Sequence, residues 1–268
     1  MKTIVITGTP KSGKTAIMLA LLNSLDQAVC IDTKVDIPLL YKFFGGQEKH
    51  NPFNIKAPVR NFMVCVGCQL CLKRCPFGAI YEEDLWIDPL ECECCGLCVQ
   101  QCSKKALQMV NMQIGEWVKV EKDSKTLLYG KLMPGATGGA SLVEELYNQA
   151  TELDKDITVI ETYGLGEIAG RMLSKASDVI LVLDPFTDEE VIDRISSFCS
   201  NAKRHVIFNK EGINEEKENA LLKKAEANDF NLISKLPYQK DLGFSLNQDI
   251  VNNEIFKKAV DQLLEILQ

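Results

Sequence analysis

The sequence has few histidines and no long apolar run, and these absences exclude several kinds of protein. Only two of its 268 residues are histidine, and neither His50 nor His205 has the spacing of a metal site. No apolar stretch approaches the roughly 20 residues of a transmembrane helix. The apolar start KTIVITG leads into a glycine- and lysine-containing loop without a cleavage-site pattern. We therefore expect a first strand instead of a signal peptide, and a cytoplasmic protein.

Positive charge is also scarce. The chain has 30 Lys and Arg against 37 Asp and Glu, which gives a net charge of -7 and argues against nucleic-acid binding. Residues 254–267 have the spacing of an amphipathic helix. Lys257 and Lys258 are offset there by Asp261 and Glu265, whereas helices that bind anionic membranes are basic. We expect this helix to pack on the core and not to anchor the chain to a membrane.

Cysteine, by contrast, is abundant. Nine of the 11 cysteines lie between residues 65 and 102. Thiols stay reduced in the cytoplasm, so metal binding is the better interpretation than disulfides. Cys30 and Cys199 lie apart in apolar stretches, where we expect buried, inert thiols.

The cysteine-rich segment is an internal repeat. CVGCQLCLKRCPFGAI at 65–80 aligns with CECCGLCVQQCSKKAL at 92–107 at a constant offset of 27 residues. Each half has the C-x2-C-x2-C-x3-C spacing of two-cluster ferredoxins, in which the fourth cysteine binds the other cluster. The spacing predicts two 4Fe-4S clusters. The expected ligands are Cys65, Cys68, Cys71 and Cys102 for one cluster, and Cys92, Cys95, Cys98 and Cys75 for the other.

A pair of structural zinc sites is the alternative interpretation. Zinc modules usually separate two short cysteine pairs instead of placing three cysteines in a row. Cys94 has no place in the two-cluster scheme, and we interpret it as an oxidation liability or a spare ligand.

Apolar segments alternate with helical patterns along the rest of the chain. The strand-like segments are 2–7, 28–32, 157–162, 178–184, 204–209 and 230–236, and the helical patterns are 14–25, 141–153, 165–176, 187–199 and 214–228. This alternation predicts an α/β fold with a mostly parallel sheet covered on both faces. It is interrupted between about 41 and 133. We expect a main domain of residues 1–59 and 111–268 and an inserted ferredoxin-like domain at 60–110, followed by a hairpin-like return to the sheet.

The stretch ITGTPKSGKT joins the first predicted strand to the first helix. Residues 8–15 fit the P-loop pattern G-x-x-x-x-G-K-[ST]. In such a loop the backbone amides bind phosphate, Lys14 reaches the β- and γ-phosphates, and the Thr15 hydroxyl binds Mg²⁺. The main domain is therefore predicted to bind a nucleotide. The predicted contacts are Gly8, Lys11, Ser12, Gly13, Lys14, Thr15 and Ala16.

Taken together, these features resemble the MinD- and ParA-like P-loop ATPases, and within them the group with a two-cluster ferredoxin inserted after the second strand. The resemblance covers almost the whole chain. Beyond the P-loop and the insert, it rests on IDTKVDIPLL at 31–40 and ETYGLG at 161–166 in the two switch positions, GEW at 115–117, FNKEG at 208–212 and LPY at 236–238. It implies that the nucleotide is ATP, that Asn209 and Pro237 contact adenine, that Asp32 supports Mg²⁺, and that the chain forms a symmetric dimer.

Three positions depart from the family pattern and bear on hydrolysis. Thr9 replaces the signature lysine, Lys34 replaces the aspartate that orients the attacking water, and Glu161 replaces the switch II aspartate. Loss of water positioning and charge stabilisation slows hydrolysis by orders of magnitude. The candidate catalytic set is Lys14, Asp32 and Glu161. We expect slow or partner-dependent ATP hydrolysis, with binding without hydrolysis as the alternative.

Three functional hypotheses follow. In the first, nucleotide state controls electron transfer through the clusters to a partner protein. In the second, the chain is an ATP-dependent carrier or maturation factor for iron-sulfur or other metal cofactors. Mrp-like carriers have a late C-x-x-C pair, and no such pair follows residue 102 here, which favours electron transfer. The third is a nucleotide sensor without hydrolysis, in which the clusters are structural.

Overall fold

The computed structural model describes residues 2–240 and 253–267. The strands are β1 (Lys2–Gly8), β2 (Ala28–Asp32), β3 (Gln47–Arg60), β4 (Leu107–Lys122), β5 (Lys125–Leu132), β6 (Ile157–Glu161), β7 (Asp178–Leu183), β8 (Lys203–Glu211) and β9 (Asn231–Pro237). The helices are α1 (Lys14–Ser24), α2 (Tyr41–Phe44), α3 (Leu70–Arg74), α4 (Leu97–Gln100), α5 (Gly139–Glu152), α6 (Glu167–Leu173), α7 (Glu190–Phe198), α8 (Glu215–Ala227) and α10 (Glu254–Leu267). Every strand and helix expected from the alternating pattern is present.

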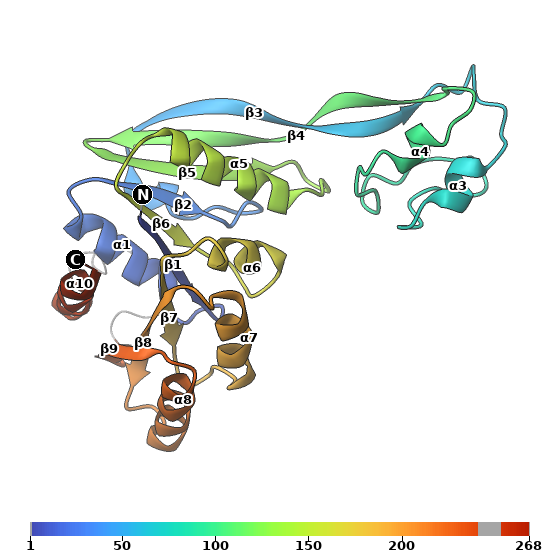
Figure 1. Ribbon diagram of the computed structural model, residues 1–268. Coiled ribbons are helices and arrows are strands. Elements are labelled where there is room, and N and C mark those ends of the chain that lie inside the picture. The colour runs from blue at the N-terminus through green and yellow to red at the C-terminus, as the bar shows by residue number, and fades with distance from the viewer. Residues whose placement is uncertain (1, 241–252, 268) are drawn as a thin grey trace.

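The described strands form one sheet in the order β3-β4-β5-β2-β6-β1-β7-β8-β9 (Figure 1). From β5 to β9 in this order, neighbouring strands are parallel, whereas β3, β4 and β5 pair antiparallel. This confirms the predicted α/β fold with a mostly parallel sheet. The β4–β5 pair confirms the hairpin-like return to the sheet.

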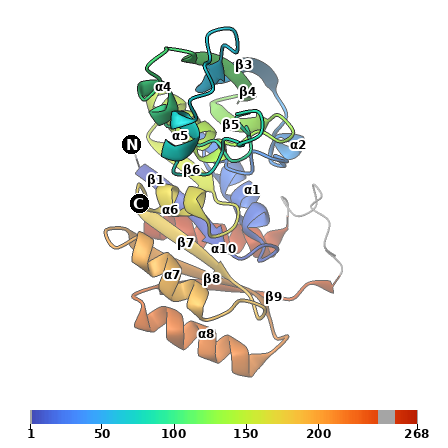
Figure 2. The same cartoon turned by 90° about the vertical axis from the view of Figure 1, so that its right-hand side faces the viewer.

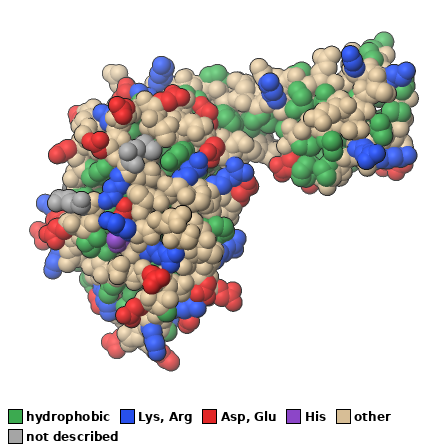
Figure 3. Space-filling view, viewed as in Figure 1, with side chains coloured by type: hydrophobic (Ala, Val, Ile, Leu, Met, Phe, Trp, Pro, Cys, Tyr) green, Lys and Arg blue, Asp and Glu red, His purple; other side chains and the backbone are tan. Residues whose placement is uncertain are grey.

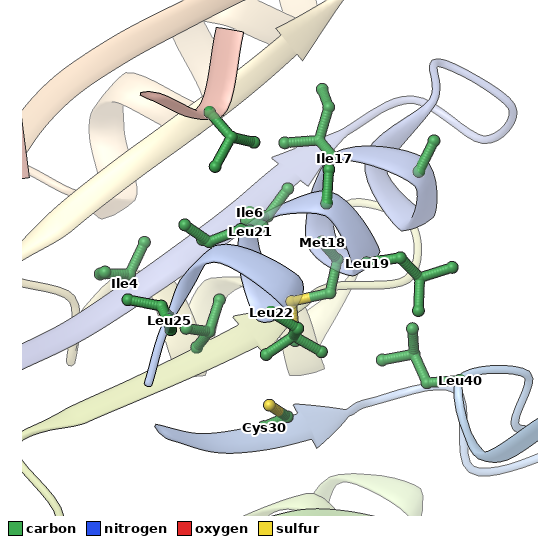
Figure 4. Close-up of a cluster of buried hydrophobic side chains, with 14 of the residues drawn as sticks. Ile4, Ile6, Ile17, Met18, Leu19, Leu21, Leu22, Leu25, Cys30 and Leu40 are labelled. Carbon is green, nitrogen blue, oxygen red and sulfur yellow. The ribbon is translucent and has the colours of Figure 1, made fainter. Parts of the chain in front are cut away.

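Helices cover both faces of the sheet because successive strand residues point to opposite sides. Ile4 and Ile6 of β1 belong to the core beneath α1 and α10, whereas Val5 belongs to the opposite core, which also includes residues of α5, α6, α7 and α8. Figure 4 shows the first of these cores, with Leu21 of α1 and Cys30 of β2 among its side chains. Burial raises the pKa of the Cys30 thiol well above its ordinary value, as expected of an inert thiol. Burial of an average Leu or Ile in such a core stabilises the fold by about 1.5–3 kcal/mol.

The C-terminal helix α10 packs against α1 in this core. Phe256, Ala259, Val260 and Leu263 are all buried there, so the expectation of core packing is confirmed. In the described part of the chain, no helix combines the length and apolar character needed to cross a bilayer.

Strand β3 has no counterpart among the predicted strands. Most of its residues are exposed, and it contains Pro52 and Pro58. Proline is tolerated on a sheet edge, and β3 is the first strand of the sheet order. Its strand conformation therefore depends on pairing with β4, which lies far away in the sequence.

Strands β3 and β4 form a two-stranded arm that leaves the sheet. Residues 115–122 of β4 pair with β5, whereas residues 107–113 pair only with β3 among the described strands. This free part of the arm is about 20 Å long at the usual rise per strand residue. Residues 61–106, here called the cysteine lobe, lie at its tip with α3 and α4 (Figures 1 and 2).

The lobe has a small core of its own. Its Ile80, Leu85 and Cys98 are buried together with Leu107, the first residue of β4. The space-filling view shows the arm and the lobe projecting from the main body (Figure 3).

Candidate functional site

The loop between β1 and α1 lies at the carboxyl ends of the parallel strands, where α/β folds usually bind ligands. Gly8 and Gly13 have φ angles of 144° and 107°. A Cβ at Gly8 would lie 2.4 Å from the carbonyl oxygen of Val182, and one at Gly13 would lie 2.3 Å from Nδ2 of Asn209. Both positions require glycine, and together they give the loop its curvature.

A cavity of about 440 Å³ opens beside this loop, which is in the range of small-molecule sites. Among the predicted residues, Lys11, Gly13, Lys14, Thr15, Ala16, Asp32, Glu161, Asn209 and Pro237 line it. Ser12 lies buried within the loop, and the carbonyl oxygen of Gly8 accepts a hydrogen bond from Lys14. The cavity is also lined by Leu39, Lys210 and Tyr238, to which the sequence assigned no role.

The side chains of Lys14 and Thr15 form hydrogen bonds to other groups of the protein in this structure. Nζ of Lys14 donates to the carbonyl oxygens of Gly8 and Thr9, at 3.1 and 2.7 Å. The Thr15 hydroxyl donates to Oε1 of Glu161 at 2.6 Å. The side chains predicted to bind phosphate and Mg²⁺ therefore have hydrogen-bond partners within the protein itself.

Burial changes the acidity of both charged groups. It raises the pKa of Glu161 to about 7, assisted by the nearby Asp32 carboxylate and opposed by the Thr15 hydrogen bond and Lys14. It lowers the pKa of Lys14, against the opposing effect of Glu161 and Asp184. The pKa of Glu161 therefore lies near neutral pH, well above that of an exposed glutamate.

Asp32 organises the loop that follows β2. Its Oδ1 accepts the backbone N–H of Lys34 at 3.0 Å, and Oδ2 accepts those of Leu39 and Leu40 at 2.9 and 3.1 Å. Nζ of Lys34 lies 4.8 Å from the ring centroid of Tyr163, so the two predicted switch segments touch each other. The predicted role of Asp32 at Mg²⁺ stays a prediction, because in this structure both of its oxygens serve the loop.

Asn209 braces the P-loop from β8. Its Nδ2 donates to the carbonyl oxygen of Ser12 at 2.8 Å, and its Oδ1 accepts the N–H of Lys210 at 2.9 Å. Nζ of Lys210 in turn contacts Oδ2 of Asp184 at 2.6 Å and the carbonyl oxygen of Lys11 at 2.9 Å. The adenine contacts assigned to Asn209 and Pro237 stay predictions. The available sequence signal for Lys210 was its position directly after Asn209 in the FNKEG stretch.

In the lobe, the eight candidate ligands gather around two small hollows. The first hollow is lined by Cys65, Cys68, Cys71 and Cys102. The second hollow is lined by Cys92, Cys95, Cys98 and Cys75. In each hollow, three cysteines come from one repeat and the fourth comes from the other. These are the two sets that the spacing predicts.

Left-handed backbone turns shape both cysteine loops. Gly67 and Gln69 have φ angles of 67° and 59°, and their repeat counterparts Cys94 and Gly96 have 51° and 73°. Cys94 thus occupies a turn position at which the first repeat has glycine. Burial raises the pKa of its thiol to about 11, and the thiol lines the second hollow.

Hydrogen-bond donors point at the cysteine sulfurs of the first hollow. Nη2 of Arg60 lies 3.2 Å from Sγ of Cys71, and the N–H of Ala106 lies 3.2 Å from Sγ of Cys102. Thiolates that bind iron accept such bonds, so this donor set fits an iron-sulfur cluster. Among the described residues, no three His, Cys, Asp or Glu lie close enough together to share a single metal ion.

Comparison with known proteins connects the lobe to ferredoxins. Residues 58–81 match the family model described as a 4Fe-4S binding domain. An uncharacterised ferredoxin of Methanocaldococcus jannaschii is 34% identical over 88 residues, which are 31% of this chain and 50% of that protein. The chain thus spans half the length of this relative.

The complete fold resembles two solved structures. A putative plasmid partition protein from Borrelia burgdorferi bound to AMPPNP has a TM-score of 0.51 at 14% identity, over 99% of this chain and 97% of its own. A ParA family ATPase from Chlorobium tepidum has a TM-score of 0.51 at 12% identity, over 98% of each chain. At these identities the likeness concerns the fold.

Proposed function

We propose that this chain, which joins the fold of the ParA- and MinD-like P-loop ATPases to a 4Fe-4S binding domain, couples nucleotide state to electron transfer through two clusters. The electrons pass to a partner protein. The observation that carries the proposal is the pair of four-cysteine hollows at the tip of an arm whose base belongs to the same sheet as the P-loop. We further propose that residues 60–110 act as a separate domain and that the chain works as a dimer.

The ligand sets support two clusters. Each hollow offers four cysteines, and in the first hollow Arg60 and Ala106 donate to sulfur. When bound, a 4Fe-4S cluster supplies one-electron chemistry at a potential set by charge and hydrogen bonds around it. The cysteines, including the fourth from the opposite repeat, hold the two sites within one small lobe.

The P-loop cavity supports ATP and Mg²⁺ as the second ligand. Lys14, which now donates to the carbonyl oxygens of Gly8 and Thr9, would hold phosphate oxygens, and the Thr15 hydroxyl, which now donates to Glu161, would hold Mg²⁺. Glu161 would support the cation in its ionised form. Lys34 places a cation on an aromatic ring where relatives have a carboxylate, which supports slow or partner-dependent hydrolysis.

A series of contacts joins the cavity to the lobe. The loop held by Asp32 includes Val35, whose carbonyl oxygen accepts the N–H of Leu132 at the end of β5. A few residues further on, the Thr137 hydroxyl donates to the carbonyl oxygen of Pro89 in the lobe at 3.3 Å. Rearrangement of the switch loop therefore has a short path to the cysteine loops.

The lobe surface supports a protein partner. Val66, which lines the first hollow, is 63% exposed, and Phe62 and Met63, which shortly precede it in the sequence, are 64% and 93% exposed. Exposed apolar groups of this kind mark interaction sites. Figure 3 shows apolar side chains gathered on the lobe.

The proposal is tested by reducing the clusters of the anaerobically purified chain with and without Mg-ATP. We expect about eight iron atoms per chain and a change in reduction rate or potential when Mg-ATP is added. Lys14→Ala should keep the iron and lose the nucleotide effect. A chain without iron, or clusters indifferent to Mg-ATP in the presence and absence of a redox acceptor, would refute it. Release of iron to an apo-protein acceptor would point instead to a carrier.

A further inference from the structure

The two hollows are related position by position. Every residue that lines the first hollow has a counterpart, 27 positions away in the sequence, among those that line the second. The internal repeat of the sequence is thus also a repeat of the two cluster environments. Any difference between the two environments must come from the side chains at paired positions.

The paired positions differ in charge. Arg60 of the first hollow corresponds to Ile87 of the second, and Lys104 corresponds to Phe77. The first hollow therefore has two cations where the second has apolar side chains. In the opposite direction, Glu93 of the second hollow corresponds to a valine.

Arg60 is the buried member of this set. It is only 8% exposed, and its Nη2 donates to Sγ of Cys71 at 3.2 Å. Its Nε and Nη1 have no hydrogen-bond partner among the described residues. A buried guanidinium requires an acceptor or an anion, and a cluster bound by four thiolates carries net negative charge. The unpaired nitrogen atoms belong to a side chain that lines the hollow such a cluster would fill.

We propose that Arg60 raises the reduction potential of the cluster bound by Cys65, Cys68, Cys71 and Cys102 above that of the other cluster. This inference rests on the proposed function, since it requires both clusters. Reduction adds one negative charge, which a buried cation and an N–H···S bond stabilise. Lys104 and Glu93 are exposed, so solvent and salt screen their contributions.

A higher potential at the first cluster would favour electron transfer from the second cluster to the first within the lobe. With clusters held by the two cysteine sets, one electron would move from the cluster of the second hollow to that of the first, with no proton transferred. In a half-reduced lobe the electron would therefore reside mainly in the first hollow, which the exposed Val66 lines and where the Phe62 ring lies 5.9 Å from Arg60. Arg60 would act on this cluster through its positive charge and its N–H···S bond to Cys71, and it would not be an iron ligand.

The test is an anaerobic redox titration followed by electron paramagnetic resonance, with iron and sulfide assayed in each sample. The wild type should show two one-electron transitions whose midpoint potentials differ by at least about 59 mV, which is a tenfold difference in the equilibrium constant of reduction. Arg60→Gln should lower the higher midpoint potential by the equivalent of at least tenfold and leave the lower midpoint potential unchanged. Lys104→Gln is the matched control, because it removes the same charge from an exposed position on the same hollow. It should cause a smaller shift.

Several outcomes overturn the inference. Equal midpoint potentials in the wild type, or two midpoint potentials that Arg60→Gln leaves unchanged, would overturn it. Neither result would argue against the presence of two clusters. If Arg60→Gln loses iron, Arg60→Met and the reciprocal change Ile87→Arg decide. Ile87→Arg must then raise the lower midpoint potential by the equivalent of at least a tenfold change in the equilibrium constant of reduction. If it does not, Arg60 has no electrostatic role. A wild-type chain without clusters would instead refute the proposed function.

Discussion

Replacing Glu161 by glutamine should remove a pH dependence from the stability of the nucleotide-free chain. Burial raises the pKa of this carboxyl to about 7, from an ordinary value of 4.5. Between these values the folded carboxyl is protonated and the unfolded one is ionised, so folding takes up a proton. The free energy of unfolding must therefore fall as pH rises from 4.5 to 7.

The size of the effect follows from the two pKa values. Their difference corresponds to about 3 kcal/mol, of which about 2.5 kcal/mol falls between pH 5 and pH 8. In a chain of this size, 1 kcal/mol changes the Tm by about 2–4 °C. The Tm of the wild type relative to Glu161→Gln should therefore drop by about 5–10 °C across this range. The amide oxygen of glutamine still accepts the Thr15 hydroxyl, so that hydrogen bond is retained.

The measurement is thermal unfolding by circular dichroism of both proteins, anaerobic and free of nucleotide, at several pH values. Glu226, an exposed glutamate on α8, provides the control substitution Glu226→Gln. Its difference from the wild type should not change with pH by more than about 1–2 °C, as expected of an exposed site. If the wild type and Glu161→Gln differ by the same amount at pH 5 and pH 8, Glu161 does not titrate near neutrality and the reasoning is wrong.

Three further substitutions test other parts of the structure. Gly13→Ala should weaken ATP binding at least tenfold in calorimetry with iron content unchanged, because its Cβ would lie 2.3 Å from Nδ2 of Asn209; an unaltered Kd would contradict this. Gly130→Ala would place a Cβ 2.6 Å from Cδ2 of Leu142. It should destabilise the chain by about 1–3 kcal/mol in urea unfolding, and an unchanged unfolding midpoint would contradict this. Cys102→Ala should remove about half of the iron, because it removes one ligand of one cluster, and full retention would show that Cys102 is not a ligand.

The main sheet could be predicted because its strands are buried on both faces. In β7 every residue is buried, so the strand appears in the sequence as a continuous apolar run between polar ends. The cysteine sets could be predicted for a different reason. The spacing of ligands around a cluster is a local constraint on the chain, and it is visible in the repeat without any knowledge of the fold.

The remaining features depend on contacts between distant segments. Strand β3 is exposed along most of its length and gains its conformation from β4. The hydrogen bonds of Asp32 and Asn209 follow from how loops close over the P-loop, which a motif does not specify. The role of Arg60 becomes visible only through its burial, although extending the 27-residue offset of the repeat to positions 60 and 87 would have paired it with Ile87.

The edge position of β3 also bears on association between copies of this chain. A long outer strand presents unpaired backbone groups on which a second copy can assemble. Pro52 and Pro58 interrupt the row of N–H donors, while Glu48, Lys49 and Lys56 keep exposed charge along it. These residues protect the arm from pairing edge to edge with the β3 strand of a second copy. A partner that binds the lobe must therefore recognise its side chains, and the projecting arm keeps the lobe accessible to such a partner.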